Sequence, residues 1–183
     1  RVAFHGTRRD LIKKQADSMG AEVIQIEVCG NEYEKQFIDG LIDLKHRGVE
    51  GVVFGDMDMA ENRQWSERAC QKAGLVSYFP LWKMEQRAVI NDLISSRFKA
   101  MIVSIDARYL PENDLGRIID QEWIEHISAL NSASDRKITY CGEMGEYHTF
   151  VIDGPFFKRP LHVRTGERVS RGDHRLIDLV ELD

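Results

Sequence analysis

The residues best suited to chemistry in this sequence lie in one short stretch, Cys141 to Phe150, which reads Cys-Gly-Glu-Met-Gly-Glu-Tyr-His-Thr-Phe. Glu143 and Glu146 are three residues apart, and a glycine comes directly before each of them. Glycine lets the backbone bend and expose its N–H groups, and a carboxylate can accept a proton or hold a cation. A packed core needs neither property. The stretch is therefore a candidate site, and the alternative is an acidic surface loop that leads into a strand.

The segments on either side predict the elements that position this stretch. Phe150 to Ile152 is a short apolar run typical of a strand, and Asp153-Gly154-Pro155 is typical of the turn that ends it. The polar segment 131–137 is typical of a loop that leads into the stretch. Further out, the pattern predicts a helix over 86–96, a strand over 98–105, a helix that includes Trp123 and Leu130, a hairpin around Thr165-Gly166 and a last strand over 177–182.

The first part of the chain alternates between helical and strand patterns. The predicted elements are a helix over 10–19 that ends at Gly20, a strand over 23–28, a helix over 32–47, a strand over 49–54, a helix over 61–73 and a strand over 75–79. Units of this length indicate the α/β class, with a parallel sheet and helices on its faces. The residue pattern of the sequence changes at Met84, and this change predicts one domain over 1–83 and a second over 84–183.

Ligands of such sheets bind beyond the carboxyl ends of the strands. Gly55 and Asp56 follow the strand predicted over 49–54, which makes Asp56 a second candidate, and the alternative is that Asp56 caps the next helix. Arg117 could bind a phosphate or carboxylate, or it could be a solvated loop residue. Trp82 is interpreted as a packing anchor rather than a group that stacks on a ligand.

Composition limits the classes of function. The 183 residues are 43% hydrophobic and 30% charged, which is typical of a soluble globular protein, and no membrane-spanning or signal-peptide pattern is present. A formal net charge of −5 argues against general nucleic-acid binding. Cys29, Cys70 and Cys141 form no CxxC pair, which favours a reduced cytoplasmic protein, and Cys141 is either a nucleophile or an inert small residue. The six histidines show no spacing typical of a metal site.

The string from Gly142 to Phe150 also resembles the signature of the diphthine–ammonia ligase family, a branch of the PP-loop ATP pyrophosphatases. That signature is Glu-x-Gly-Glu-aromatic-x-Thr, followed by a strand and an Asp-Gly-Pro or Asp-Ala-Pro turn, and each of these positions matches here. His148 lies where many archaeal and eukaryotic members have a second acid, which resembles the bacterial members. Further landmarks along the chain are His5-Gly6-Thr7-Arg8, Gly55-Asp56, Pro80-Leu81-Trp82 and Leu115-Gly116-Arg117.

The resemblance implies a Rossmann-like, HUP-type parallel sheet with helices on both faces, followed by a smaller α+β C-terminal domain. It implies an ATP-dependent ligase that adenylates a carboxylate and then lets ammonia displace AMP, with ATP and Mg²⁺ as cofactors. The catalytic residues that it implies are Glu143, Glu146 and His148. The substrate-binding residues are Gly142, Gly145, Tyr147, Thr149 and Arg117, and the nucleotide-binding residues are Gly55, Asp56, His5 and Arg8.

The acceptor in the best-understood members of the family is diphthine on translation elongation factor 2. The histidine at position 148 leaves a different carboxylate acceptor, including a small molecule, open for this chain. The remaining expectations about partners are ammonia as co-substrate, no membrane, no nucleic acid, and a homodimer contact through a sheet edge or through Phe156-Phe157.

The phosphate-gripping Ser-Gly-Gly-x-Asp-Ser loop of the family does not occur in this sequence. In the family it precedes the His-Gly-x-Arg region, which here begins at His5, so we expect an N-terminal segment beyond the sequence given. Two alternatives stay open. One is a PP-loop enzyme that acts on RNA or a small molecule, and the other is a non-catalytic nucleotide-binding module, if the loop is truly missing.

Overall fold

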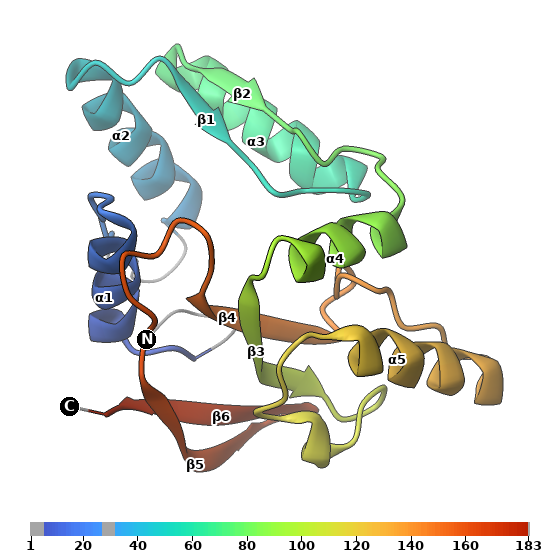
Figure 1. Cartoon of the computed structure of the whole chain (residues 1–183). Helices are drawn as coiled ribbons and strands as arrows, with labels where there is room; N and C mark the ends of the chain where they lie inside the picture. The colour runs from blue at the N-terminus through green and yellow to red at the C-terminus, as the bar shows by residue number, and fades with distance from the viewer. Residues whose placement is uncertain (1–5, 27–31, 183) are drawn as a thin grey trace. The chain divides into compact units, whose positions relative to one another are not determined.

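The computed structural model describes residues 6–26 and 32–182 and confirms the α/β class. The chain forms two compact units, one made of residues 24–84 and the other of residues 85–183 together with the segment up to Val23. The first unit contains a parallel two-stranded sheet, and the second contains a four-stranded sheet (Figure 1). No helix in the described part of the chain is long and apolar enough to cross a membrane.

The unit of residues 24–84 contains the parallel pair expected from the alternating pattern. Its elements are α2 (Tyr33–His46), β1 (Gly51–Val53), α3 (Ala60–Ala73) and β2 (Val76–Tyr78). The strands pair in parallel from Gly51↔Val76 to Val53↔Tyr78. The two helices and the sheet share a small apolar core that consists of Leu41, Ala69, Cys70, Ala73 and Leu75.

One predicted strand in this unit is wrong over its described part. Residues 23–26 have no regular secondary structure, and residues 27 and 28 lie outside the described residues. The side chains of Ile24 and Ile26 are about half exposed, at 47% and 46%. The β-branched residues satisfy the local preference for a strand, but a strand also needs a partner for its backbone groups, and sequence preference alone does not supply one.

The second unit is built on an antiparallel sheet with the strand order β4-β3-β6-β5. Its strands are β3 (Lys99–Asp106), β4 (Tyr147–Asp153), β5 (Val163–Arg171) and β6 (His174–Glu181). Its helices are α1 (Arg9–Met19), α4 (Gln86–Ser95), the short 3-10 helix η1 (Glu112–Asp114) and α5 (Gln121–Ala133). These bounds confirm the predicted helices and strands between 86 and 130, and the strand that follows the motif.

The core of this unit forms between the central strand β3 and α5. Ile102, Val103 and Ile105 of β3 are fully buried, as is Trp123 of α5, because these side chains pack together in one apolar cluster that excludes water. The helix begins where Asp120 caps it by accepting a hydrogen bond from the backbone N–H of Trp123 (2.9 Å).

The β5–β6 hairpin differs from the predicted one. Strand β5 continues through Thr165 and Gly166, and the reversal comes at Gly172 and Asp173. A shift of register between Thr165 and Arg168 shows that the glycine lies at a β-bulge. A glycine between two polar residues indicates either a bulge or a turn, and the pairing partner decides between them.

Helix α1 belongs to the same compact unit as the antiparallel sheet. The Gln15 side chain donates a hydrogen bond to the backbone oxygen of Val151 in β4 (2.7 Å), and Leu11 is buried in the core of this unit. The helix ends at Gly20, as predicted, in a left-handed conformation with φ of 69°. The division into domains 1–83 and 84–183 stays a prediction, and these packing units group the first helix differently.

Candidate functional site

The segment from Thr139 to Glu146, which we call the motif loop, makes two successive turns and leads directly into β4. The N–H of Gly142 donates to the Thr139 oxygen (3.2 Å), and the N–H of Gly145 donates to the Gly142 oxygen (3.0 Å). Both glycines have positive φ, 71° and 82°. A Cβ atom at Gly142 would also lie 2.7 Å from the backbone oxygen of Tyr147. The two glycines are therefore required by the shape of the loop.

The carboxylate of Glu146 lies inside this loop and is only 1% exposed. One oxygen accepts from the Thr139 N–H (2.7 Å), and the other accepts from the Thr139 hydroxyl (3.0 Å) and the Met144 N–H (2.9 Å). The backbone oxygen of Glu146 also accepts from the N–H of Asp106 at the end of β3 (2.9 Å). Charge-assisted hydrogen bonds of this kind are stronger than neutral ones. Glu146 therefore holds both ends of the motif loop together and attaches the loop to the sheet.

Thr139 is a functional candidate that the sequence analysis missed. Besides its two hydrogen bonds to Glu146, its hydroxyl oxygen accepts a hydrogen bond from the N–H of Glu143 (2.8 Å). The threonine thus connects the two glutamates of the motif. A threonine between a polar loop and a glycine-rich stretch gives no signal of this role, because the contact depends on how the loop folds back on itself.

Glu143 and Cys141 lie on the outer part of the loop. The Glu143 side chain is half-buried, and Met144 beside it is 66% exposed, so this part of the loop faces solvent. Cys141 contacts the first residue of α4: its N–H donates to the Gln86 side-chain oxygen (3.2 Å), and its thiol lies 3.4 Å from the Gln86 backbone oxygen. The cysteine therefore takes part in attaching the loop to α4.

His148 and Thr149 follow the motif loop as part of β4, where they pair with Ser104 and Ile102 of β3. Burial lowers the pKa of the half-buried His148, the nearby His174 lowers it further, and Glu146 opposes these effects. The imidazole of His148 is therefore neutral at pH 7 and can accept a proton. The hydroxyl of Ser104 opposite is fully buried and has no hydrogen-bond partner among the described residues.

Two residues predicted to bind substrate have contacts within the protein. Tyr147 is 4% exposed, its hydroxyl donates to the backbone oxygen of Tyr140, and its ring meets Trp123 edge-on at 5.2 Å between centroids. Arg117 pairs with Asp114 (3.2 Å), and its guanidinium lies 5.5 Å from the centre of the Trp123 ring. Both contacts support the core beneath the motif loop, and the predicted contacts with substrate stay predictions.

The predicted nucleotide-binding residues fall in different places. Gly55 and Asp56 lie beyond the carboxyl end of β1 in the unit of residues 24–84, as expected. The alternative that Asp56 caps α3 is wrong, because the N-cap residue of that helix is Met59. Arg8 donates to Asp178 of β6 through Nε (3.1 Å) and Nη2 (2.5 Å). His5 lies outside the described residues.

The same end of the β1–β2 sheet carries a cluster of aromatic rings and cations. The ring of Trp82 has the Arg63 guanidinium 4.7 Å from its centre and the Lys83 ammonium 5.0 Å from it. The N–H of Lys83 donates to the backbone oxygen of Met57, next to Asp56 (2.9 Å). This arrangement supports the packing role expected of Trp82 and places two positive charges on the segments around Asp56.

The structure thus brings together the predicted residues from Gly142 to Thr149, whereas Gly55 and Asp56 belong to the other unit. Among the described residues, no three histidine, cysteine, aspartate or glutamate side chains are grouped in a way that could hold a metal ion. A single carboxylate such as Asp56 fits the way Mg²⁺ binds with a nucleotide, because that ion takes few protein ligands and relies on phosphate and water oxygens.

The fold and the motif loop define an α/β protein with a glycine–glutamate site on an antiparallel sheet, and family comparison identifies the group. Residues 85–181 match the diphthamide synthase C-terminal domain, and residues 1–77 match the diphthamide synthase N-terminal domain. The first match covers more than half of the chain and includes the whole motif loop. The chain belongs to the diphthamide synthase family.

Individual relatives agree with this assignment. The chain is 32% identical over 125 residues to the diphthine–ammonia ligase of Schizosaccharomyces pombe. The aligned residues make up 68% of this chain and 20% of that relative. It is 32% identical over 122 residues to the human diphthine–ammonia ligase, and the aligned residues make up 66% of this chain and 45% of that relative. The chain therefore aligns with less than half the length of these relatives.

Proposed function

We propose that this protein acts in an ATP-dependent ligase reaction that joins ammonia to the carboxylate of diphthine. The observation that carries the proposal is the match of residues 85–181 to the diphthamide synthase C-terminal domain, because this match includes the motif loop. The names of the relatives, diphthine–ammonia ligase, support the same reaction.

In the proposed reaction, an oxygen of the acceptor carboxylate attacks the α-phosphorus of ATP, and pyrophosphate leaves. The nitrogen of ammonia then attacks the acyl carbon, the bond to AMP breaks, and the nitrogen loses a proton as the amide forms. Two groups of this chain suit the second step: the half-buried carboxylate of Glu143 and the neutral imidazole of His148. Either can accept the proton that the nitrogen must lose.

Glu146 has a different part in this proposal. Its two oxygens already accept three hydrogen bonds within the loop. Its predicted catalytic role therefore stays a prediction, and we propose that it acts by positioning Glu143. Thr139 shares that role, because its hydroxyl connects the Glu146 carboxylate to the N–H of Glu143.

ATP and Mg²⁺ belong to the proposal as co-substrate and ion. Gly55 and Asp56 are proposed to border the nucleotide, since they follow β1 at the edge where parallel sheets bind ligands. Asp56 would supply one oxygen to Mg²⁺, and bound Mg²⁺ would neutralise charge on the phosphates. We also retain elongation factor 2 as the proposed bearer of diphthine, and a cytoplasmic location, which the free thiols of Cys70 and Cys141 support.

The experiment that tests the proposal measures AMP and pyrophosphate released from ATP by the purified protein. Release should require the diphthine-bearing acceptor, and amide should form only when an ammonium salt is added. Glu143→Gln should lower turnover at least tenfold while the unfolding curve stays unchanged. If the protein binds ATP but releases no AMP even with the acceptor and an ammonium salt present, the ligase proposal is contradicted and a nucleotide-binding module is favoured.

A further inference from the structure

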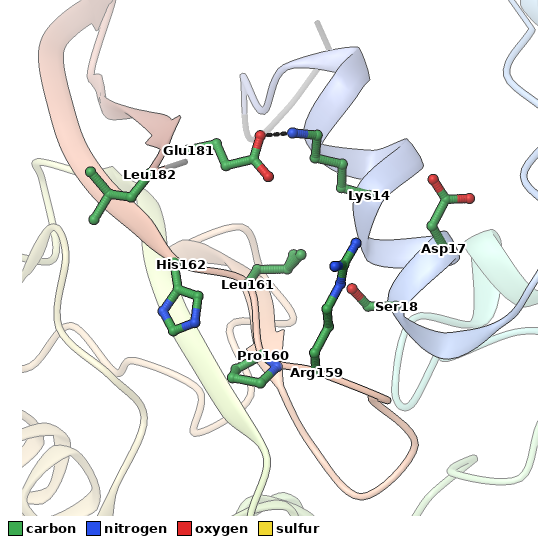
Figure 2. Close-up of a pocket in the computed structure, with 9 residues that line it drawn as sticks. All are labelled: Lys14, Asp17, Ser18, Arg159, Pro160, Leu161, His162, Glu181 and Leu182. Carbon is green, nitrogen blue, oxygen red and sulfur yellow. Dashed lines mark ion pairs between the residues drawn. The ribbon is translucent and has the colours of Figure 1, made fainter.

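A pocket in the unit with the antiparallel sheet lies away from the motif loop. It has a volume of about 310 Å³ and forms where three distant segments meet: the end of α1, residues 159–162 after β4, and residues 181–182 at the end of β6 (Figure 2). The motif loop precedes β4 and the pocket follows it. Because seven residues of strand separate them, the two sites are roughly 20 Å apart.

Three contacts across the segments hold the pocket in shape. The N–H of Lys158 donates to the backbone oxygen of Ser18 (2.7 Å), and the N–H of Leu182 donates to that of His162 (2.8 Å). Lys14 and Glu181 form an ion pair across the opening, drawn as the dashed line in Figure 2. A pocket that is held by such contacts exists before a ligand arrives, which lowers the cost of binding.

Two polar groups in the pocket are unpaired. Ser18 is only 4% exposed, its hydroxyl has no hydrogen-bond partner among the described residues, and Figure 2 shows the Arg159 side chain pointing toward it. The guanidinium of Arg159 extends into the same space and has no ion-pair partner in the described part of the chain. The Ser18 hydroxyl is not among the buried unpaired atoms of the described residues and is therefore open to the pocket, where it and the exposed Arg159 can both donate hydrogen bonds to a ligand.

The other groups in the pocket limit the charge and shape of such a ligand. Glu181 already neutralises Lys14, and the carboxylate of Asp17, which also lines the pocket, repels negative charge and so disfavours a ligand that carries more than one. The imidazole of His162 adds a polar group at the opposite side (Figure 2). Leu161 is buried at the centre of the pocket and offers apolar surface. One negative charge attached to an apolar body satisfies these conditions better than a dianion.

We propose that this pocket binds a small monocarboxylate, with its carboxylate between Arg159 and Ser18 and its apolar part against Leu161. The planar guanidinium can donate two parallel hydrogen bonds to a carboxylate, and the Ser18 hydroxyl can donate a third. The volume is at the lower end of the range for ligand pockets, which fits a small molecule. This site is independent of the proposed ligase reaction.

The test is a titration of the ¹⁵N-labelled protein, followed by NMR, with hexanoate, acetate and inorganic phosphate as probes. Hexanoate should bind most tightly and shift the amides of Ser18 and Leu161, acetate should bind more weakly because it lacks the apolar chain, and phosphate should bind least. Arg159→Gln should weaken hexanoate binding about tenfold or more, and Ser18→Ala several-fold. Arg164→Gln is the matched control, because that exposed arginine on β5 lies outside the pocket.

Three results would overturn the proposal. The first is that none of the three probes shows saturable binding. The second is that phosphate binds as well as hexanoate, which would indicate general attraction to positive charge. The third is that Arg164→Gln weakens hexanoate binding as much as Arg159→Gln. General attraction to the positive charges of residues 159–164, and not the pocket, would then be responsible. Unchanged spectra outside the pocket in each variant show that the fold is retained.

Discussion

Replacing Glu146 with glutamine should destabilise the folded protein, separately from any effect on catalysis. The amide keeps the size of the carboxylate but has one acceptor oxygen and one NH₂ donor, and three donors point at this side chain. In either orientation, at least one of the backbone N–H groups of Thr139 and Met144 faces the NH₂ group and loses its acceptor. A buried unpaired donor costs about 1–3 kcal/mol, and the remaining bonds lose their charge assistance. We therefore expect Glu146→Gln to lower the free energy of unfolding by about 2–4 kcal/mol.

The assay is urea unfolding at pH 7, followed by circular dichroism, for three variants alongside the parent. Glu143→Gln is the matched control and should change the unfolding free energy by less than about 1 kcal/mol, because that side chain is half-buried. Thr139→Val should resemble Glu146→Gln, since it removes both contacts of the hydroxyl. If Glu146→Gln stays within about 0.5 kcal/mol of the parent and turnover is lost, the positioning role is wrong and Glu146 acts on substrate directly.

Two further predictions concern the same region. The pKa of the His148 imidazole should lie below 6.5 in an NMR titration. The folded state then binds fewer protons than the unfolded state. The contribution of His148 therefore makes the free energy of unfolding decrease as the pH falls below about 6.5. A pKa at or above 6.5 would contradict the burial argument. Gly142→Ala should lower the free energy of unfolding in urea by about 2 kcal/mol or more, because φ is 71° and the new Cβ atom would meet the Tyr147 backbone oxygen. Gly145→Ala should lower it by only about 1 kcal/mol, because no atom lies within 4 Å of the new Cβ atom. Equal costs would show that the close approach at Gly142 has relaxed.

Much of the fold could be predicted from local pattern. Gly20 and Gly74 end α1 and α3 as expected, because a glycine at a helix end adopts the left-handed conformation that other residues avoid. The strand after the motif was also predictable from its apolar run. The predicted strand over 23–28 failed over its described part, and the hairpin at Thr165-Gly166 became a bulge. Both errors concern pairing partners, which local preference does not encode.

The residue types of the candidate site could be predicted from the sequence, but the structural role of each residue could not. The spacing of Glu143 and Glu146 makes the two carboxylates look equivalent, yet only Glu146 is buried, with its oxygens bonded inside the loop. The contribution of Thr139 depends on the loop folding back over seven residues, which no pattern of residue types reveals. The pocket near Arg159 is made by three segments distant in sequence, and its walls became apparent only in the structure.

The positions of the three tryptophans give each unit its own optical reporter. Trp65 and Trp82 lie in the unit of residues 24–84, whereas Trp123 is the single tryptophan of the unit with the motif loop, where it is fully buried against Tyr147. An indole in an apolar core emits at shorter wavelength than an exposed one. A protein with phenylalanine at positions 65 and 82 would therefore report, through the emission of Trp123 alone, whether the motif loop and its sheet stay folded when the other unit is perturbed.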